Sequence, residues 1–168
     1  TPYGIYRPAT VPAELLPQYV HMLDGETTMI ESTNPQGPPL EYESDQPPPS
    51  PVGPTSSVPI GTVCGTRSGD KGGDANLGIY ARNDTTWAWL DNNLTTEKLK
   101  NLLPETQNLS IERYRYPKIR SLNFLIRGLL QEGVAASTRQ DPQAKALGEW
   151  LRSRQMEIPI QVIKEPKG

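Results

Sequence analysis

The sequence predicts an α+β protein with a split βαβ sheet, its helices on one face, and an extended proline-rich arm in front of it. Three observations lead to this prediction. Thirteen of the 18 prolines fall within residues 1–59. Beyond residue 58, strand-like and helical patterns follow in the order β–β–α–β–β–α–β, which becomes βαββαβ when the first strand is set aside. A run rich in glycine and aspartate separates the first two strands.

The arm covers residues 1–57 and is acidic. It holds one arginine and seven acidic residues, a net charge of −6, whereas residues 58–168 carry +4. Asp24-Gly25 between two apolar runs predicts a β-hairpin near residues 19–31, and residues 35–57 should run extended without regular structure. An isolated hairpin is marginal in water. We therefore expect the arm to pack on its own domain, on a missing larger domain or, preferentially, on a second copy of the chain.

Residues 58–168 form the predicted domain, and its strands should make one sheet of the ferredoxin-like pattern. Strands are expected over 60–66, 77–82, 109–116 and 122–126, the last two as a hairpin. A helix should begin at Asp84 and bury Trp87 and Trp89, and a second should open at Thr95 or Thr96. Asp141-Pro142 predicts a helix start, and residues 158–162 predict a final edge strand.

The run from Arg67 to Asn76 is the candidate site, predicted as an ordered glycine-rich loop. Glycine backbone N–H groups can approach an anion closely, and Arg67 and Lys71 add charge-assisted hydrogen bonds. The predicted ligand-binding residues are Arg67, Ser68, Gly69, Asp70, Lys71, Gly72, Asp74 and Asn76. Asp70 and Lys71 are the candidates for acid–base catalysis. The alternative is a polar network that only fixes a hairpin connection.

Several site classes find no support in the sequence. The glycine spacing matches neither the Walker loop nor the dinucleotide fingerprint. One cysteine, Cys64, and one histidine, His21, cannot form a Cys/His metal site, so neither a metal nor a cofactor is predicted. Cys64 should be a buried, inert thiol. Asp70 and Asp74 in one loop are weak evidence for Mg²⁺.

Partners and location follow from composition. No run approaches 18 apolar residues and no signal peptide is evident, so the predicted location is cytoplasmic, without a membrane partner. Arg113-Tyr-Arg-Tyr116 interleaves basic and aromatic residues, but the aromatic signature of RNA-binding sheets is absent, and no nucleic-acid partner is predicted. Thr1 in place of a methionine suggests a processed product or a piece of a longer chain.

The same residues carry a family resemblance. Arg67-Ser-Gly-Asp-Lys-Gly and Asp74-Ala-Asn-Leu-Gly resemble the signature of the C-terminal ferredoxin-like domain of the acyclic terpene utilisation protein A-like (AtuA-like) family. Weaker matches follow at Trp87-x-Trp-Leu90, Asn123-Phe124 and Asp141 to Lys145, so that the resemblance covers about residues 58–162. One departure is Ala144, where relatives usually have glycine.

The resemblance implies a larger, Rossmann-like N-terminal domain, and bacterial relatives are linked to acyclic terpene and acyl-CoA metabolism. Two functions of different class follow. In the first, the domain helps to bind an acyl-CoA-type or other anionic ligand together with the larger domain. In the second, it is a non-catalytic oligomerisation module built from the arm and the sheet edges.

Overall fold

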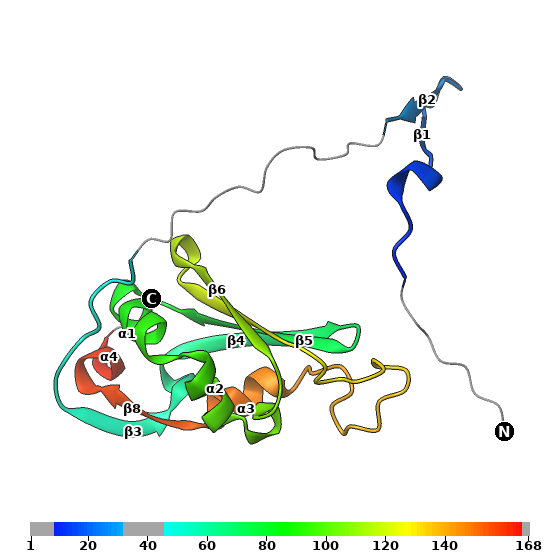
Figure 1. Ribbon diagram of the computed structural model, residues 1–168. Coiled ribbons are helices and arrows are strands. Elements are labelled where there is room, and N and C mark those ends of the chain that lie inside the picture. Colours follow the sequence, from blue (N-terminus) through cyan, green and yellow to red (C-terminus); the bar gives the residue numbers. More distant parts are fainter. Residues whose placement is uncertain (1–8, 32–45, 166–168) are drawn as a thin grey trace. The chain divides into compact units, whose positions relative to one another are not determined.

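The computed structural model describes residues 9–31 and 46–165, which belong to two separate units of the chain (Figure 1). Residues 46–165 contain the domain, and residues 9–31 contain the hairpin of the arm. Each unit has its own strands, and the candidate site lies within the larger one.

The main sheet of the larger unit has four antiparallel strands. They are β4 (Cys64–Lys71), β5 (Asp74–Ala81), β6 (Ile111–Tyr116) and β7 (Ser121–Ile126), in the spatial order β4-β5-β7-β6. β5 and β6 are joined through helices and flank β7, which is the split βαβ arrangement. The predicted α+β, ferredoxin-like fold is confirmed, as is the hairpin formed by β6 and β7.

Helices cover one side of this sheet. α1 (Asp84–Asn93) begins at the N-cap Asn83, whose side chain accepts a hydrogen bond from the Thr86 N–H at 2.8 Å. Thr95 caps α2 (Thr96–Leu102) in the same way. α3 (Leu147–Ser153) packs on β4. The connections include short 3-10 turns at Ile60–Thr62, Pro104–Thr106 and Pro117–Ile119.

The core lies between the sheet and these helices. Alternate residues of β5 and β7 point into it, as their strict alternation of buried and part-exposed positions shows. Trp87 and Trp89 are buried there, as predicted. The fully buried residues of β5 and β7 are Ala75, Leu77, Ile79, Leu122, Phe124 and Ile126. The opposite side of the sheet carries no helix among the described residues.

The prediction of a single sheet is wrong. β8 (Gln155–Pro159) does not join the main sheet, because it pairs with β3 (Thr55–Pro59) in a second, two-stranded sheet. β4 takes the edge position beside β5 instead. The expected strand at 158–162 ends at Pro159, after which the chain turns into the short helix α4 (Ile160–Lys164). Residues 60–62, expected in a strand, form a 3-10 turn.

The helix expected from Asp141 begins only at Leu147. The Asp141 carboxylate accepts hydrogen bonds from the backbone N–H groups of Lys145 and Ala146, at 2.8 and 2.9 Å. It therefore closes a compact turn in place of a first helical turn. Ala144 inside this turn has φ +52°, a left-handed conformation that favours glycine. This explains in backbone terms why glycine suits the position.

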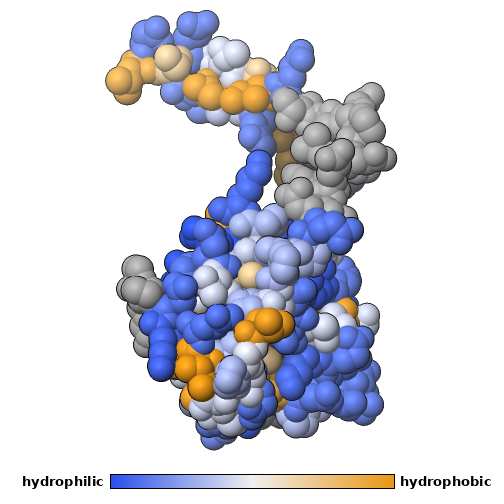
Figure 2. Space-filling model, turned by 90° about the vertical axis from the view of Figure 1, so that its left-hand side faces the viewer, coloured by the Kyte–Doolittle hydropathy of each residue, from blue (hydrophilic) through white to orange (hydrophobic). Residues whose placement is uncertain are grey.

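The smaller unit contains the predicted hairpin. β1 (Gln18–His21) pairs with β2 (Thr27–Ile30) in antiparallel register, after a 3-10 turn at Ala13–Leu15. The connection runs from Met22 to Glu26 and is longer than the predicted two-residue turn. Apolar side chains gather on its surface (Figure 2). The exposed ones are Val11, Leu15, Leu16, Tyr19, Val20, Met22, Leu23, Met29 and Ile30.

Two further expectations concern the segment before the domain and the membrane. Residues 35–45 of the expected extended stretch lie outside the described residues, 46–54 have no helix or strand, and 55–57 belong to β3. Among the described residues, no helix is long and apolar enough to cross a bilayer.

Candidate functional site

The run from Arg67 to Asn76 is not a loop but the end of a β-hairpin. β4 and β5 pair without interruption up to Lys71 opposite Asp74, and only Gly72-Gly73 forms the turn. Gly72 has φ +68°, which a two-residue hairpin turn requires. Gly73 is fixed by close approach, because a Cβ there would lie 2.4 Å from the Gln131 carbonyl oxygen. The prediction of a loop over residues 67–76 is therefore wrong, because residues 67–71 belong to β4 and residues 74–76 belong to β5.

Strand alternation divides the motif between the two sides of the sheet. Cross-strand register places Arg67, Gly69 and Lys71 on the side opposite the core, and Ser68 and Asp70 on the helix-covered side. We call the uncovered side the open face. Its positions are Gly65, Arg67, Gly69 and Lys71 of β4, Asp74, Asn76, Gly78 and Tyr80 of β5, Ser121, Asn123 and Leu125 of β7, and Glu112, Tyr114 and Tyr116 of β6.

Ser68 and Asp70 therefore lie away from the open face. The Ser68 hydroxyl accepts a hydrogen bond from the Gly148 N–H at 2.9 Å and donates one to the Lys145 carbonyl at 3.3 Å. These two hydrogen bonds connect the start of α3 to β4, so the role of Ser68 is structural. The two catalytic candidates, Asp70 and Lys71, point to opposite sides of the sheet. The structure does not bring them together on one reacting group.

Asp74 is already engaged by a chain of polar contacts. Its carboxylate accepts hydrogen bonds from the Gly128 N–H at 2.7 Å and from Arg127 at 2.8 Å. Arg127 also donates to Glu112 at 2.7 Å, and Glu112 accepts from the Tyr114 hydroxyl. The Gly128 N–H, followed by Arg127, lowers the pKa of Asp74, while Tyr114, followed by Arg127, lowers that of Glu112. Both carboxylates are thus held ionised, and Arg127, which contacts both, offsets one of their two negative charges.

Three cations surround Gly69 on the open face. Arg67 and Lys71 are its same-face neighbours on β4, each about 7 Å along the strand. Lys145 reaches the same place from the turn before α3, and its Nζ lies 3.6 Å from where a Cβ of Gly69 would be. Among the described residues none of the three forms a salt bridge, and Lys71 Nζ donates only to the Asp70 carbonyl at 3.1 Å. We call Arg67, Gly69, Lys71 and Lys145 the cationic corner.

The centre of the open face carries small and amide side chains. Asn76 Nδ2 donates to Asn123 Oδ1 at 3.3 Å, which leaves the Asn76 oxygen and the Asn123 nitrogen available to other groups. Gly78 lies between Arg67 and Asn123 in the cross-strand row. A Cβ at Gly78 would come no closer than 3.4 Å to a neighbouring atom. Backbone is thus accessible beside the cationic corner.

Tyrosines occupy the far end of the same face. The Tyr80 ring lies over Gly65, because a Cβ at Gly65 would lie 2.2–2.7 Å from the ring atoms and hydroxyl. Only glycine permits this placement, in which the ring covers the neighbouring strand. Tyr80 is nevertheless 44% exposed. Tyr114 and Tyr116 on β6 are exposed to a similar degree.

The alternating segment Arg113-Tyr-Arg-Tyr116 is split by the same geometry. Its tyrosines lie on the open face, and its arginines lie on the helix side, where both bind Asp91 of α1. Arg113 reaches one carboxylate oxygen at 2.8 Å, and Arg115 reaches the other at 2.6 Å. Burial alone would raise the pKa of Asp91, but the hydrogen bonds from Arg115 and Arg113 outweigh it and lower that pKa. These arginines are therefore structural.

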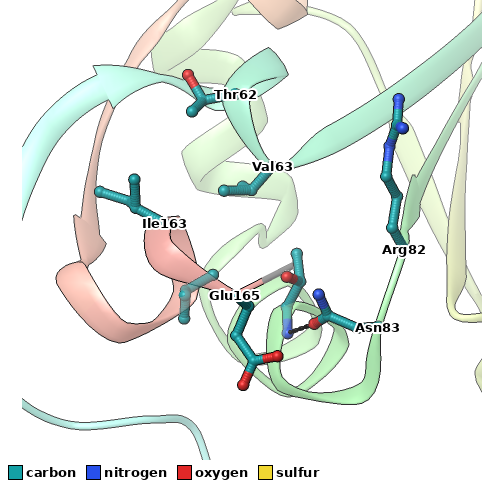
Figure 3. A pocket seen from close by; sticks show the side chains of 8 residues that line it. Thr62, Val63, Arg82, Asn83, Ile163 and Glu165 are labelled. Carbon is teal, nitrogen blue, oxygen red and sulfur yellow. Dashed lines mark hydrogen bonds between the residues drawn. The ribbon is translucent and has the colours of Figure 1, made fainter. Parts of the chain in front are cut away.

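Other candidate places in the larger unit are closed or small. Burial raises the pKa of Cys64 to about 12, so this thiol is inert as predicted. A crevice between the 3-10 turn at Ile60–Thr62, α1 and α4 has a volume of about 10 Å³, room for one water (Figure 3). Asn83 and Arg82 line it. Within the described ranges, no three His, Cys, Asp or Glu side chains are grouped to hold a metal.

Several residues of the open face escaped the site prediction. Lys145, Asn123 and Tyr80 join it from segments far apart in the sequence. Lys145 and Asn123 were matched only as part of the family resemblance. A period-two pattern over residues 74–80 puts Asn76, Gly78 and Tyr80 on one side, but the predicted strand began only at residue 77 and so left Asn76 in the loop.

Comparison with known proteins gives one match. A family model described as the AtuA ferredoxin-like domain matches residues 58–157. No curated protein and no solved structure matches the chain.

Proposed function

Because this chain belongs to the AtuA ferredoxin-like domain family, we propose that it binds the anionic part of an acyl-CoA-type or other anionic ligand. The ligand would be shared with a larger Rossmann-like domain of the same precursor. The cationic corner would hold its phosphate or carboxylate groups. The observation that carries this proposal is that Lys145 Nζ lies 3.6 Å from the Cβ position of Gly69, between Arg67 and Lys71 on the same face of β4, and that none of the three cations forms a salt bridge among the described residues. The carboxylate opposite Lys71, that of Asp74, is bound by Arg127 and by the Gly128 N–H.

The chemistry of the corner suits an anion. Arg67 offers a planar fork of donors for phosphate or carboxylate, and Lys71 and Lys145 add point charges. Gly78, which is partly exposed, leaves the strand backbone open to close approach. Of the ligand-binding residues predicted from sequence, Arg67, Gly69, Lys71 and Asn76 are kept in this proposal. The other three predicted residues would act indirectly. Ser68 would hold the backbone of Lys145, Asp74 would hold Arg127, and Gly72 would form the hairpin turn.

Titration of the whole chain with acetyl-CoA and with pyrophosphate tests the proposal. At low salt we expect both to bind, and Arg67→Ala and Lys145→Ala each to weaken binding about 10-fold, as loss of a charge-assisted contact would. Arg154→Ala is the matched control, because this exposed arginine after α3 forms no salt bridge with any residue that the structure describes. Binding that is absent at millimolar ligand, or that ignores Arg67 and Lys145, would refute the proposal.

A second candidate function is an oligomerisation module. Residues 11–30 of the arm, which include the hairpin, expose nine large apolar side chains, more than a monomeric surface of that size needs. Its groove beside Leu16, Met29 and Ile30 has a volume of about 500 Å³. The arm would pack on a second copy of the chain. Sedimentation tests this: the intact chain should be oligomeric at micromolar concentration, and a chain lacking residues 1–34 should be monomeric.

A further inference from the structure

On the open face, the cationic corner is followed by the exposed ring of Tyr80. This arrangement indicates which class of ligand the face binds. We propose that the face binds a mononucleotide moiety, with its phosphates in the cationic corner and its base stacked on Tyr80. The inference rests on the proposed function, because it assumes that the corner holds an anion. It adds that the anionic groups in the corner are the phosphates of a nucleotide.

The base would stack on a ring that already lies over the neighbouring strand. The Tyr80 ring occupies the space above Gly65, where a Cβ would otherwise lie. The residue is nevertheless 44% exposed, which leaves part of its surface to a ligand. Stacking on an exposed tyrosine is a common way to hold a base, and it is tolerant of base identity. A ring that is already in place loses little side-chain freedom on binding.

Along β5, the path from Tyr80 to the cationic corner crosses Gly78, which has no side chain. Gly78 follows Tyr80 on the open face of β5, and Gly69 lies one step further on β4. Four residues of strand separate Gly65 from Gly69, a distance of about 13 Å. A nucleoside with one or two phosphates spans a length of this order. Arg67 lies between the two ends and opposite Gly78, where it can reach the first phosphate.

Amide groups line the side of this path. The unused Asn76 oxygen and Asn123 nitrogen, left over from their mutual hydrogen bond, are one acceptor and one donor. A ribose offers hydroxyl groups that can pair with both. The face thus presents an aromatic plane, hydroxyl partners and cations in the order in which a nucleotide presents base, sugar and phosphate.

A single strand of nucleic acid fits the same face less well. Its backbone would need cations along the whole track, but Arg113 and Arg115 lie on the other side of the sheet, bound to Asp91. At the β6 edge the open face carries Glu112 instead. Among the open-face positions that the structure describes, the cations without a salt bridge lie in this one corner, which suits one nucleotide.

The test compares ADP with pyrophosphate on the full chain by calorimetric titration at low salt. We expect ADP to bind at least about 10-fold more tightly than pyrophosphate, since base stacking adds that much. Tyr80→Ala should remove this advantage and leave pyrophosphate binding unchanged, and Tyr80→Phe should retain it. Tyr116→Ala is the matched control, because this exposed tyrosine lies two strands away in the same row.

The possible failures are distinguishable. If pyrophosphate binds through Arg67 but ADP binds no more tightly, the nucleotide inference is overturned and the proposed anion site stands. If neither binds, both are overturned. If a ten-nucleotide RNA binds far more tightly than ADP and loses affinity with Tyr114→Ala and Tyr116→Ala, the face binds nucleic acid strands and the inference is wrong.

Discussion

Removing the carboxylate of Asp91 should destabilise the domain far more than removing that of Asp84 from the same helix. The Asp91 side chain is 0% exposed, and its partners Arg113 and Arg115 are 18% and 20% exposed. Asp91→Ala leaves two guanidinium groups largely buried without their counterion. Asp84 instead pairs with Arg120 at 2.5 Å on the surface, where the aspartate is 85% exposed.

The structure sets the size of the two effects. Breaking one side of a buried ion pair costs about 3–5 kcal/mol. Arg113 keeps its bonds to the carbonyls of Leu94 and Asp91, at 3.0 and 2.6 Å, and both arginines touch solvent. We therefore expect a loss near the lower end, about 3 kcal/mol. The exposed Asp84 pair contributes about 0–1 kcal/mol.

Urea unfolding followed by tryptophan fluorescence measures both variants, because Trp87 and Trp89 lie on the same helix and are buried. Asp91→Ala should lower the free energy of unfolding by about 3 kcal/mol at unchanged m-value. Asp84→Ala should change it by less than about 1 kcal/mol. Equal losses in the two variants would refute the reasoning, since burial of the pair would then not decide its contribution.

Three further predictions follow from local contacts. Ser68→Ala should cost about 1–2 kcal/mol of unfolding free energy in urea, because the Gly148 N–H and Lys145 carbonyl lose their partner; an unchanged midpoint would show that this hydroxyl is dispensable. Since the folded pKa of Asp74 is lowered, its contribution to stability is complete above the unfolded pKa and is lost as the pH falls through the folded value. Asp74→Asn should therefore flatten the decline of thermal stability below about pH 4, and an identical decline in both proteins would contradict this. Ala144→Gly should shift the free energy of unfolding by less than about 1 kcal/mol, because relief of the left-handed strain offsets the lost methyl burial; a loss above about 2 kcal/mol would show that φ +52° carries no strain.

Sequence patterns predicted the fold class because hydrophobic periodicity is a local property. The α1 and α2 helices and the β6–β7 hairpin appear close to their expected positions for this reason. Sheet membership is not local. Whether β4 or β8 lies beside β5 depends on long-range pairing, and nothing in residues 155–162 distinguishes a strand of the main sheet from one that pairs with β3.

The candidate site was predicted in part for the same reason. Residues 67–76 were found from glycines and charges, which also mark loops. The register of β4 on β5 had to be known before these residues could be assigned to strands. Only this register shows that Ser68 and Asp70 lie on the opposite side of the sheet from Arg67 and Lys71. Lys145 could not be placed beside Gly69 from the sequence, because the turn held by Asp141 directs it there.

The alternation along β6 has a consequence for how mutations combine in this protein. Arg113 and Arg115 hold α1 to the sheet, while Tyr114 and Tyr116, between and after them, have no part in that contact. Residues on opposite sides of a strand share few partners, so the energies of their substitutions should add. A substitution at either tyrosine should then leave the stability contributed by the Asp91 contact unchanged. The open face of this strand can therefore change while its contact with α1 is kept.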